Sequence, residues 1–243
     1  MNQQLSILLA ALSLGIGATH AQTAQVTFEP PKSGQPMQTT GGASRGSDCS
    51  QNLEHFRANV MPLIPVDQQG LTVAAHPTFF VYVPPTAAPK AFFSLQDEQG
   101  MSHYQTVIPL SQPGILSIEL PESVSLAVGK NYRWYFVVMC DGTLRPDSPF
   151  VEGYVQRIEP EAALAAQLQG ATPLEQATLY GQAGIWHETL VTLAELRRSQ
   201  PDNPDIAASW EAVLSSVGLE AIASQPLIDI SLKREASRAR QPL

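Results

Sequence analysis

The chain has 243 residues, 44% of them hydrophobic, and a formal net charge of −8, with 14 Lys and Arg against 22 Asp and Glu. This length can supply the core of one domain with a smaller module beside it. The modest, evenly spread negative charge leaves no basic face, so binding to nucleic acid or to an anionic membrane surface is not expected.

Residues 1–21 are predicted to be a secretory signal peptide. Residues 5–17 are uncharged and mostly apolar, and Thr19 and Ala21 place small side chains at the positions read for cleavage. The apolar run is shorter than the ~20 residues of a membrane span, and no later segment approaches that length. The mature protein is therefore expected to be periplasmic or secreted, without a membrane span. An uncleaved signal that remains as an anchor is the alternative.

Residues 22–48 are predicted to be a flexible linker, because they are rich in Gln, Thr, Gly, Ser and Pro and lack an apolar period. Beyond the linker the chain has two cysteines, Cys49 and Cys140. An even number of cysteines in an exported protein favours a disulfide. This disulfide would close a loop of about 90 residues and stabilise the fold by ~4 to 5 kcal/mol if it is unstrained. Two free buried thiols are the alternative.

Residues 49–159 are predicted to form a β-sandwich. Short apolar or alternating segments follow one another, each bounded by Pro or Gly, after a first strand signal at Leu71. These segments are 78–83, 91–96, 102–108, 114–120, 132–140 and 150–158. The short connections favour about seven antiparallel strands in two sheets. The spacing of Leu126, Gly129 and Tyr132 is typical of the tyrosine corner of immunoglobulin-like and fibronectin-like sandwiches.

Residues 160–220 are predicted to form a helical module. Thr172 and Glu175 make a capping box at one helix start, and Asn203 caps another. Between these starts the chain has the spacing of one tetratricopeptide-like hairpin. A lone hairpin cannot bury both of its faces, so it must pack on a third helix, on the sandwich or on a partner. Residues 221–243 are predicted to be a C-terminal tail.

Several stretches of the chain have the form of a known family. They are residues 45–49, 77–84, 95–98, 113–115, 129–136, 140–141, 151–157, 184–186 and 193–197. At these positions the chain resembles the domain of unknown function 928 family of cyanobacterial exported proteins, which has no assigned activity. The glycine-rich stretch departs from the family's form, with Ala43 and Ser44 where a Thr before the Arg is typical. The resemblance implies export, a cyanobacterium-like source and, as a lead to partners, sensor proteins with the extracytoplasmic CHASE2 domain.

The sequence carries no pattern typical of catalysis. None of the histidines after the signal peptide has a second ligand at zinc spacing, and the glycine-rich residues 41–46 lack the pattern of a phosphate-binding loop. A triad of His103 with Asp97 or Asp141 would depend entirely on the fold, as it would in any chain of this length. An enzyme is therefore not expected, and neither is a cofactor or a metal.

Five charged residues are candidates for a binding site at one end of the sandwich. Asp97 and Glu98 lie at a predicted hairpin tip, Asp141 lies in the central hairpin loop, and Glu152 lies opposite Arg133 on adjacent strands. Together they suggest a calcium or ligand site. The alternative is structural, because aspartates commonly form turns and an Arg–Glu pair commonly bridges neighbouring strands.

Two functions are compatible with these observations. The first is a non-catalytic protein–protein interaction module acting outside the cytoplasmic membrane, because the helical hairpin needs a surface to pack on and no catalytic pattern competes with this interpretation. The second is a ligand- or ion-binding protein that uses the loops of the sandwich. The sequence favours the interaction module.

Overall fold

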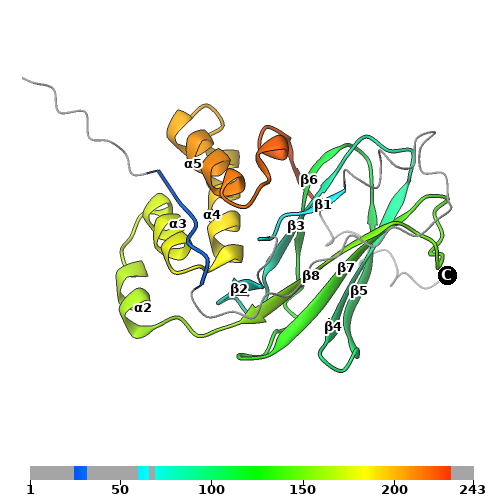
Figure 1. Cartoon of the computed structure of the whole chain (residues 1–243), viewed down its shortest axis with the longest axis horizontal. Coiled ribbons are helices and arrows are strands. Elements are labelled where there is room, and N and C mark those ends of the chain that lie inside the picture. The colour runs from blue at the N-terminus through cyan, green and yellow to red at the C-terminus, as the bar shows by residue number, and fades with distance from the viewer. Residues whose placement is uncertain (1–24, 32–59, 66–68, 231–243) are drawn as a thin grey trace, which may run out of the picture.

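The computed structural model describes residues 25–31, 60–65 and 69–230, and within them two sheets pack beside a group of helices (Figure 1). The four-stranded sheet has the order β1-β3-β6-β9 and the five-stranded sheet the order β2-β8-β7-β4-β5. In the first sheet these strands are β1 (Met61–Pro62), β3 (Thr78–Val83), β6 (Gly114–Glu119) and β9 (Leu227–Asp229). In the second they are β2 (Gly70–Thr72), β8 (Phe150–Arg157), β7 (Asn131–Met139), β4 (Lys90–Asp97) and β5 (Ser102–Pro109).

The strand β7 lies at the centre of the five-stranded sheet, as its alternation predicts. It pairs antiparallel with β4 on one side and with β8 on the other. Trp134, Phe136 and Val138 share one face of the strand and are fully buried. Phe79 of the other sheet meets Trp134 with ring centroids 5.5 Å apart, so the two sheets share one aromatic core.

The prediction of a mostly β fold followed by helices is confirmed, but the sheets are mixed. β2 pairs parallel with β8, and β9 pairs parallel with β6. β2 contains Leu71, where the first strand was expected, whereas β9 was not expected. Both strands have only three residues, too few for an alternating pattern to give their direction. Part of the range expected as a tail, residues 221–243, therefore adds a strand to the four-stranded sheet.

The helices are α2 (Ala162–Leu168), α3 (Pro173–Gln182), α4 (Trp186–Ser199) and α5 (Pro204–Ser215), followed by the short 3₁₀ helix η1 (Glu220–Ile222). The predicted capping box is confirmed at α3, where the Thr172 hydroxyl accepts from the Glu175 amide and the Glu175 carboxylate accepts from the Thr172 amide. Asn203 caps α5 through the amide of Asp205. None of the helices in the described residues is long and apolar enough to cross a bilayer.

The helical module packs directly on the sheets. The indole of Trp186, at the start of α4, is fully buried and donates from Nε1 to the Leu63 carbonyl at 2.7 Å. Trp210 of α5 belongs to the same hydrophobic core and donates to the Ala223 carbonyl at 3.0 Å. Both α5 and the sheets thus cover the hairpin formed by α3 and α4.

Residues 25–31 belong to this core, although residues 22–48 were expected to be a linker. Val26 and Phe28 are buried, and the Phe28 ring meets Trp186 edge-on with centroids 4.7 Å apart. The segment, blue in Figure 1, runs along the helices and binds α3 through the Glu29 amide and the Gly181 carbonyl at 2.9 Å. The rest of the predicted linker lies outside the described residues.

Cys140 lies just after β7 and packs against the core. Its predicted disulfide partner, Cys49, lies outside the described residues, so the pairing stays a prediction.

Candidate functional site

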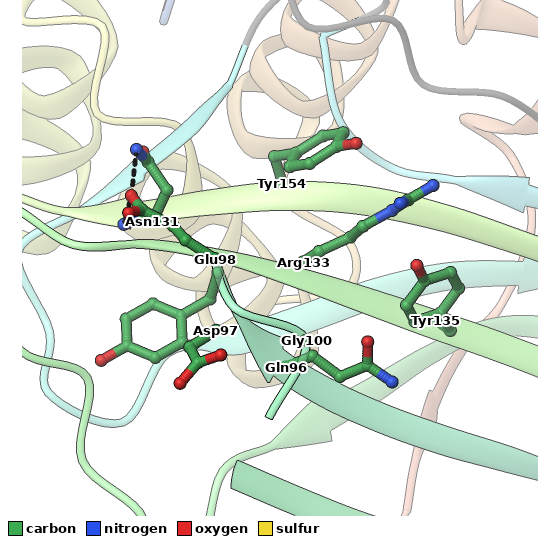
Figure 2. A pocket seen from close by; sticks show the side chains of 9 residues that line it. Gln96, Asp97, Glu98, Gly100, Asn131, Arg133, Tyr135 and Tyr154 are labelled. Atoms are coloured by element: carbon green, nitrogen blue, oxygen red, sulfur yellow. Dashed lines mark hydrogen bonds between the residues drawn. The ribbon is translucent and has the colours of Figure 1, made fainter. Parts of the chain in front are cut away.

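A pocket of about 350 Å³ opens on the outer face of the five-stranded sheet, beside the β4–β5 hairpin (Figure 2). Its lining combines aromatic rings with polar and charged groups. The lining residues are Gln96, Asp97, Glu98, Gly100, Asn131, Tyr132, Arg133, Tyr135 and Tyr154. The pocket faces away from the core, because Arg133 and Tyr135 alternate with the buried Trp134 along β7.

Arg133 lies at the centre of the pocket and is held in place from several directions. Its Nε and Nη2 both donate to Glu152 Oε2, at 3.1 and 2.5 Å. The strand register places Arg133 opposite Tyr154 and Glu152 opposite Tyr135, so the guanidinium lies 4.9 Å from the centroid of the Tyr135 ring and 5.5 Å from that of Tyr154. The Glu152 side chain is 2% exposed, whereas that of Arg133 is 40% exposed.

Glu152 and the burial of the pocket also shift the pKa values of Arg133 and Tyr135. Burial lowers the pKa of the Arg133 guanidinium, but the hydrogen bond and the charge of Glu152 outweigh burial, so the pKa is raised. Burial raises the pKa of the Tyr135 phenol, with the charge of Arg133 acting against that rise. The pocket therefore presents the Arg133 cation between two tyrosine rings, an arrangement suited to binding through aromatic and charged contacts.

Asp97 shapes the hairpin that forms one wall of the pocket. Its Oδ1 accepts from the backbone amides of Gln99 at 3.0 Å and Met101 at 2.8 Å, and its Oδ2 lies 3.2 Å from His103 Nε2. Burial raises the pKa of Asp97, but these hydrogen bonds outweigh it and lower the pKa overall. The carboxylate thus has a structural role in closing the turn.

Glu98 links the tip of the same hairpin to the start of β7 through hydrogen bonds. Its Oε1 accepts from the Asn131 side-chain amide at 2.8 Å and from the Asn131 backbone amide at 3.3 Å (Figure 2). The Gln69 side chain donates to the side-chain oxygen of Asn131. The amide of Asn131 is thus oriented by contacts on both of its atoms, which fixes this side of the pocket.

Asp141 lies apart from the other candidates, in the loop after β7. Its Oδ1 accepts from the amide and hydroxyl of Thr143 at 3.0 and 2.6 Å, and its Oδ2 lies 3.4 Å from Arg145. Asn131 begins β7 and Asp141 lies two residues past its end, so an extended strand separates them by roughly 30 Å. The structure therefore brings Asp97, Glu98, Arg133 and Glu152 together and leaves Asp141 at the other end.

The arrangement suits binding better than metal coordination or nucleophilic attack. In the part of the chain that the structure describes, no group of three or more His, Cys, Asp or Glu is arranged to hold a metal ion. The residues that line the pocket include no Ser, Thr, Cys or His. The two acids of the hairpin are occupied with backbone and side-chain donors that stabilise the turn.

Tyr135 and Tyr154 are the site residues that the sequence interpretation missed. Tyr135 lies two positions after Arg133 on the same strand face, and the register of the β7–β8 hairpin places Tyr154 directly across from Arg133. Both could have been found by assigning the outward-facing residues of β7 and aligning them with β8 in the correct hairpin register. Neither tyrosine was singled out because residues 132–140 are mostly apolar on both faces, a pattern that marks a buried strand and not a binding surface.

Comparison with curated protein sequences gives no match. The family model described as Domain of Unknown Function (DUF928) matches residues 40–227, which is most of the chain. That range includes every residue of the pocket around Arg133 and all four helices. The chain therefore belongs to the DUF928 family.

Proposed function

We propose that the protein is a non-catalytic protein–protein interaction module that acts outside the cytoplasmic membrane and binds its partner at the pocket around Arg133. The observation that carries this proposal is the pairing of Arg133 with a buried Glu152 between two tyrosine rings. Arg and Tyr are enriched among the residues that dominate binding energy at protein interfaces. The rigid support of the guanidinium lowers the entropy lost when a partner binds.

The geometry also indicates which chemistry a partner would bring. The bonds to Glu152 use Nε and Nη2 of Arg133, and no acceptor for Nη1 lies within the described residues. A carboxylate or carbonyl of the partner would bind Nη1, and an aromatic or apolar side chain would pack against Tyr154. A CHASE2-type sensor protein, which the family resemblance implies, is the first partner to test.

A site-specific cross-linking experiment tests this function. A photoreactive phenylalanine at position 154 should form an adduct with one envelope protein of the native host, and the same residue in place of the exposed Leu144 should not. Arg133→Lys keeps the charge but loses the planar contact between the rings, so it should abolish the adduct at position 154. An adduct that forms equally from both positions, or that survives Arg133→Lys, would contradict the proposal.

A second candidate function is the binding of a small molecule at the same pocket. Its volume of about 350 Å³ lies at the lower end of the range for small-molecule sites, roughly 300 to 1,000 Å³. A thermal-shift screen with small molecules and calcium distinguishes this function, since a ligand at 100 times its Kd adds about 2.7 kcal/mol to stability. A hit that Arg133→Lys removes would favour the small molecule over the protein partner.

We further infer that the two sheets form an immunoglobulin-like sandwich. The order of β8, β7 and β4 in one sheet and of β3 and β6 in the other supports it. So does the hydroxyl of Tyr132, which accepts from the Ala127 amide at 3.0 Å, the hydrogen bond of a tyrosine corner. In such sandwiches, binding commonly uses the strand faces and end loops, where the Arg133 pocket lies.

A further inference from the structure

A second pocket, of about 380 Å³, lies between α4 and one end of the four-stranded sheet. It is lined by the residues just before and at the start of β3, the end of β6, the end of β9, and one face of α4. We call it the α4 pocket. It is separate from the pocket around Arg133, and the two have no lining residue in common.

The charged side chains of the α4 pocket are mostly acidic. Glu119, Glu188, Glu195 and Asp229 line it together with one cation, Arg198. Arg198 forms an ion pair with Asp229 at 2.6 Å. The pocket therefore has an excess of carboxylates that favours a positively charged ligand.

Glu188 is the buried acid of this pocket, with 7% of its surface exposed. Its Oε1 accepts three hydrogen bonds, from the Thr72 hydroxyl at 2.7 Å and from the amides of Val73 and Ala74 at 3.1 and 2.9 Å. Its Oε2 is buried and has no hydrogen-bond partner within the described residues. A buried acceptor without a partner destabilises the folded protein, so a group that supplies a donor there gains free energy on binding.

Arg198, at the other end of the same face of α4, has a buried donor without an acceptor. Its Nη2 donates to the Ser117 hydroxyl at 2.6 Å as well as to Asp229. Its Nε is buried without an acceptor among the described residues. One pocket thus contains both an acceptor that lacks a donor and a donor that lacks an acceptor, which together suggest a ligand that carries both groups.

His187 forms a wall of the pocket and is not one of these ligand-binding groups. Its Nδ1 lies 2.9 Å from the Thr78 carbonyl, and because a carbonyl only accepts, Nδ1 carries the proton. The other nitrogen, Nε2, lies against Gly70, where an added Cβ would be only 2.7 Å away. Nε2 has no hydrogen-bond partner within the described residues, but it lies against the Gly70 backbone, so we do not assign it to the ligand.

The distance between Glu188 and Arg198 along α4 determines how long a ligand must be to contact both. Glu188, Val191, Glu195 and Arg198 follow one another at helical spacing on one face of α4. Ten residues separate the first from the last, about 15 Å along the helix axis. A molecule that reaches both Glu188 and Arg198 must be elongated.

We propose that the α4 pocket binds an elongated primary amine, with its ammonium group on Glu188 Oε2 and an uncharged oxygen at its far end on Arg198 Nε. An ammonium supplies three donors and a charge that matches the carboxylate excess. The far group is an alcohol or amide oxygen because a carboxylate there would be repelled by Glu195 and Asp229. This proposal is independent of the function proposed for the Arg133 pocket.

Isothermal titration of the mature chain with four matched probes tests the proposal. 6-Amino-1-hexanol carries both groups, hexylamine lacks the oxygen, 1-hexanol lacks the ammonium, and 6-aminohexanoate has a carboxylate in place of the alcohol. The aminoalcohol should bind most tightly, hexylamine about tenfold more weakly, and 1-hexanol not at all. Absence of binding by both amines, or tighter binding of 6-aminohexanoate, would overturn the assignment.

Two variants tie the binding to the named atoms. Glu188→Gln keeps an oxygen for Thr72, Val73 and Ala74 but replaces Oε2 with an amide that donates, so it should weaken the aminoalcohol at least thirtyfold. Glu211→Gln removes an exposed carboxylate from α5 and should leave the affinity unchanged. Equal affinity in wild type and Glu188→Gln would disprove the ammonium site.

Arg198→Lys keeps the charge next to Asp229 but lacks the Nε donor. It should bind hexylamine as wild type does and lose the tenfold preference for the aminoalcohol. Because this variant leaves Glu188 untouched, it also tests the site if Glu188→Gln does not fold. A preference that survives in Arg198→Lys would remove Arg198 from the proposed site.

Discussion

At the scale of single residues, His187 and Glu188 are adjacent buried side chains at the start of α4. Their burial should change the stability of the protein with pH in opposite directions. Burial lowers the pKa of His187 from 6.5 to about 4, and its hydrogen bond to Thr78 only partly opposes that change. Burial raises the pKa of Glu188, although the Thr72 hydroxyl and the amides around Oε1 oppose it. Burial thus acts against the charged form of each residue in the folded protein.

His187 should make the protein less stable in acid. Between pH 6.5 and 4 the unfolded chain takes up a proton at this residue and the folded chain does not, so stability is present above pH 6.5 and is lost as pH falls. The shift corresponds to about 3 kcal/mol. Urea denaturation at pH 7 and pH 4 measures it, and His187→Gln should flatten the slope. An unchanged slope in that variant would show that other groups cause the acid sensitivity.

Glu188 should act in the opposite direction. Its folded pKa is raised, so its contribution is present below its ordinary value of 4.5 and is lost as pH rises through the folded pKa. The stability of Glu188→Gln relative to wild type should therefore increase with pH. Thermal unfolding across this range measures the difference, with the exposed Glu211→Gln as the control. A difference that is flat with pH, or that matches the control, would contradict burial of an ionisable carboxyl here.

The sequence indicated the Arg133–Glu152 pair, but no pattern in it indicated that Glu188 is buried in a pocket. Arg133 and Glu152 lie on strands joined by a recognisable hairpin, so their proximity follows from local pattern. The expected register was wrong, because Tyr154 lies opposite Arg133 and Glu152 is its diagonal neighbour. Glu188 is buried only because α4 packs on β2, where the amides of residues 73 and 74 reach its carboxylate. That contact joins segments more than 100 residues apart, and no periodicity within either segment encodes it.

At the scale of elements, the long strands, the capped helices and the position of β2 were predictable, but β9 and the parallel pairing of β2 were not. The nine residues of β7 repeat their alternation often enough to mark a strand, and the cap at Thr172 marks the start of α3. β2 and β9 have three residues each, and each forms by pairing with a longer strand of its sheet. Residues 25–31 form no regular element and join the core through two apolar side chains.

That segment should contribute to stability as a core element does. Phe28→Ala removes a ring that is 6% exposed and packs on Trp186, so the free energy of unfolding should fall by about 3 to 5 kcal/mol. Thr27→Ala, at an exposed neighbouring position, should change it by no more than about 0.5 kcal/mol. Urea denaturation of both variants measures these changes. A Phe28→Ala effect as small as that of Thr27→Ala would mean that the segment is a linker after all.

At the scale of the whole molecule, the predicted disulfide between Cys49 and Cys140 would tie the N-terminal part to the centre of the five-stranded sheet. Mass spectrometry of peptides from non-reduced protein, recovered from the native host, identifies it directly. If it forms, Cys140→Ser should lower stability by up to about 5 kcal/mol, because the long loop is released in the unfolded chain. Two alkylated thiols in that preparation would rule the disulfide out.

The sheets and the helical module share one continuous core, and this continuity predicts that neither part folds alone. Truncation after Pro160 removes β9 from the edge of β6 and uncovers the carbonyl of Leu63 and the apolar surface around Phe79. The truncated chain should bind a hydrophobic dye and aggregate. Residues 161–230 supplied in trans should restore solubility, because they return the covering surface without a covalent link. A truncated chain as soluble and as resistant to urea as the full chain would instead make the sheets an independent domain.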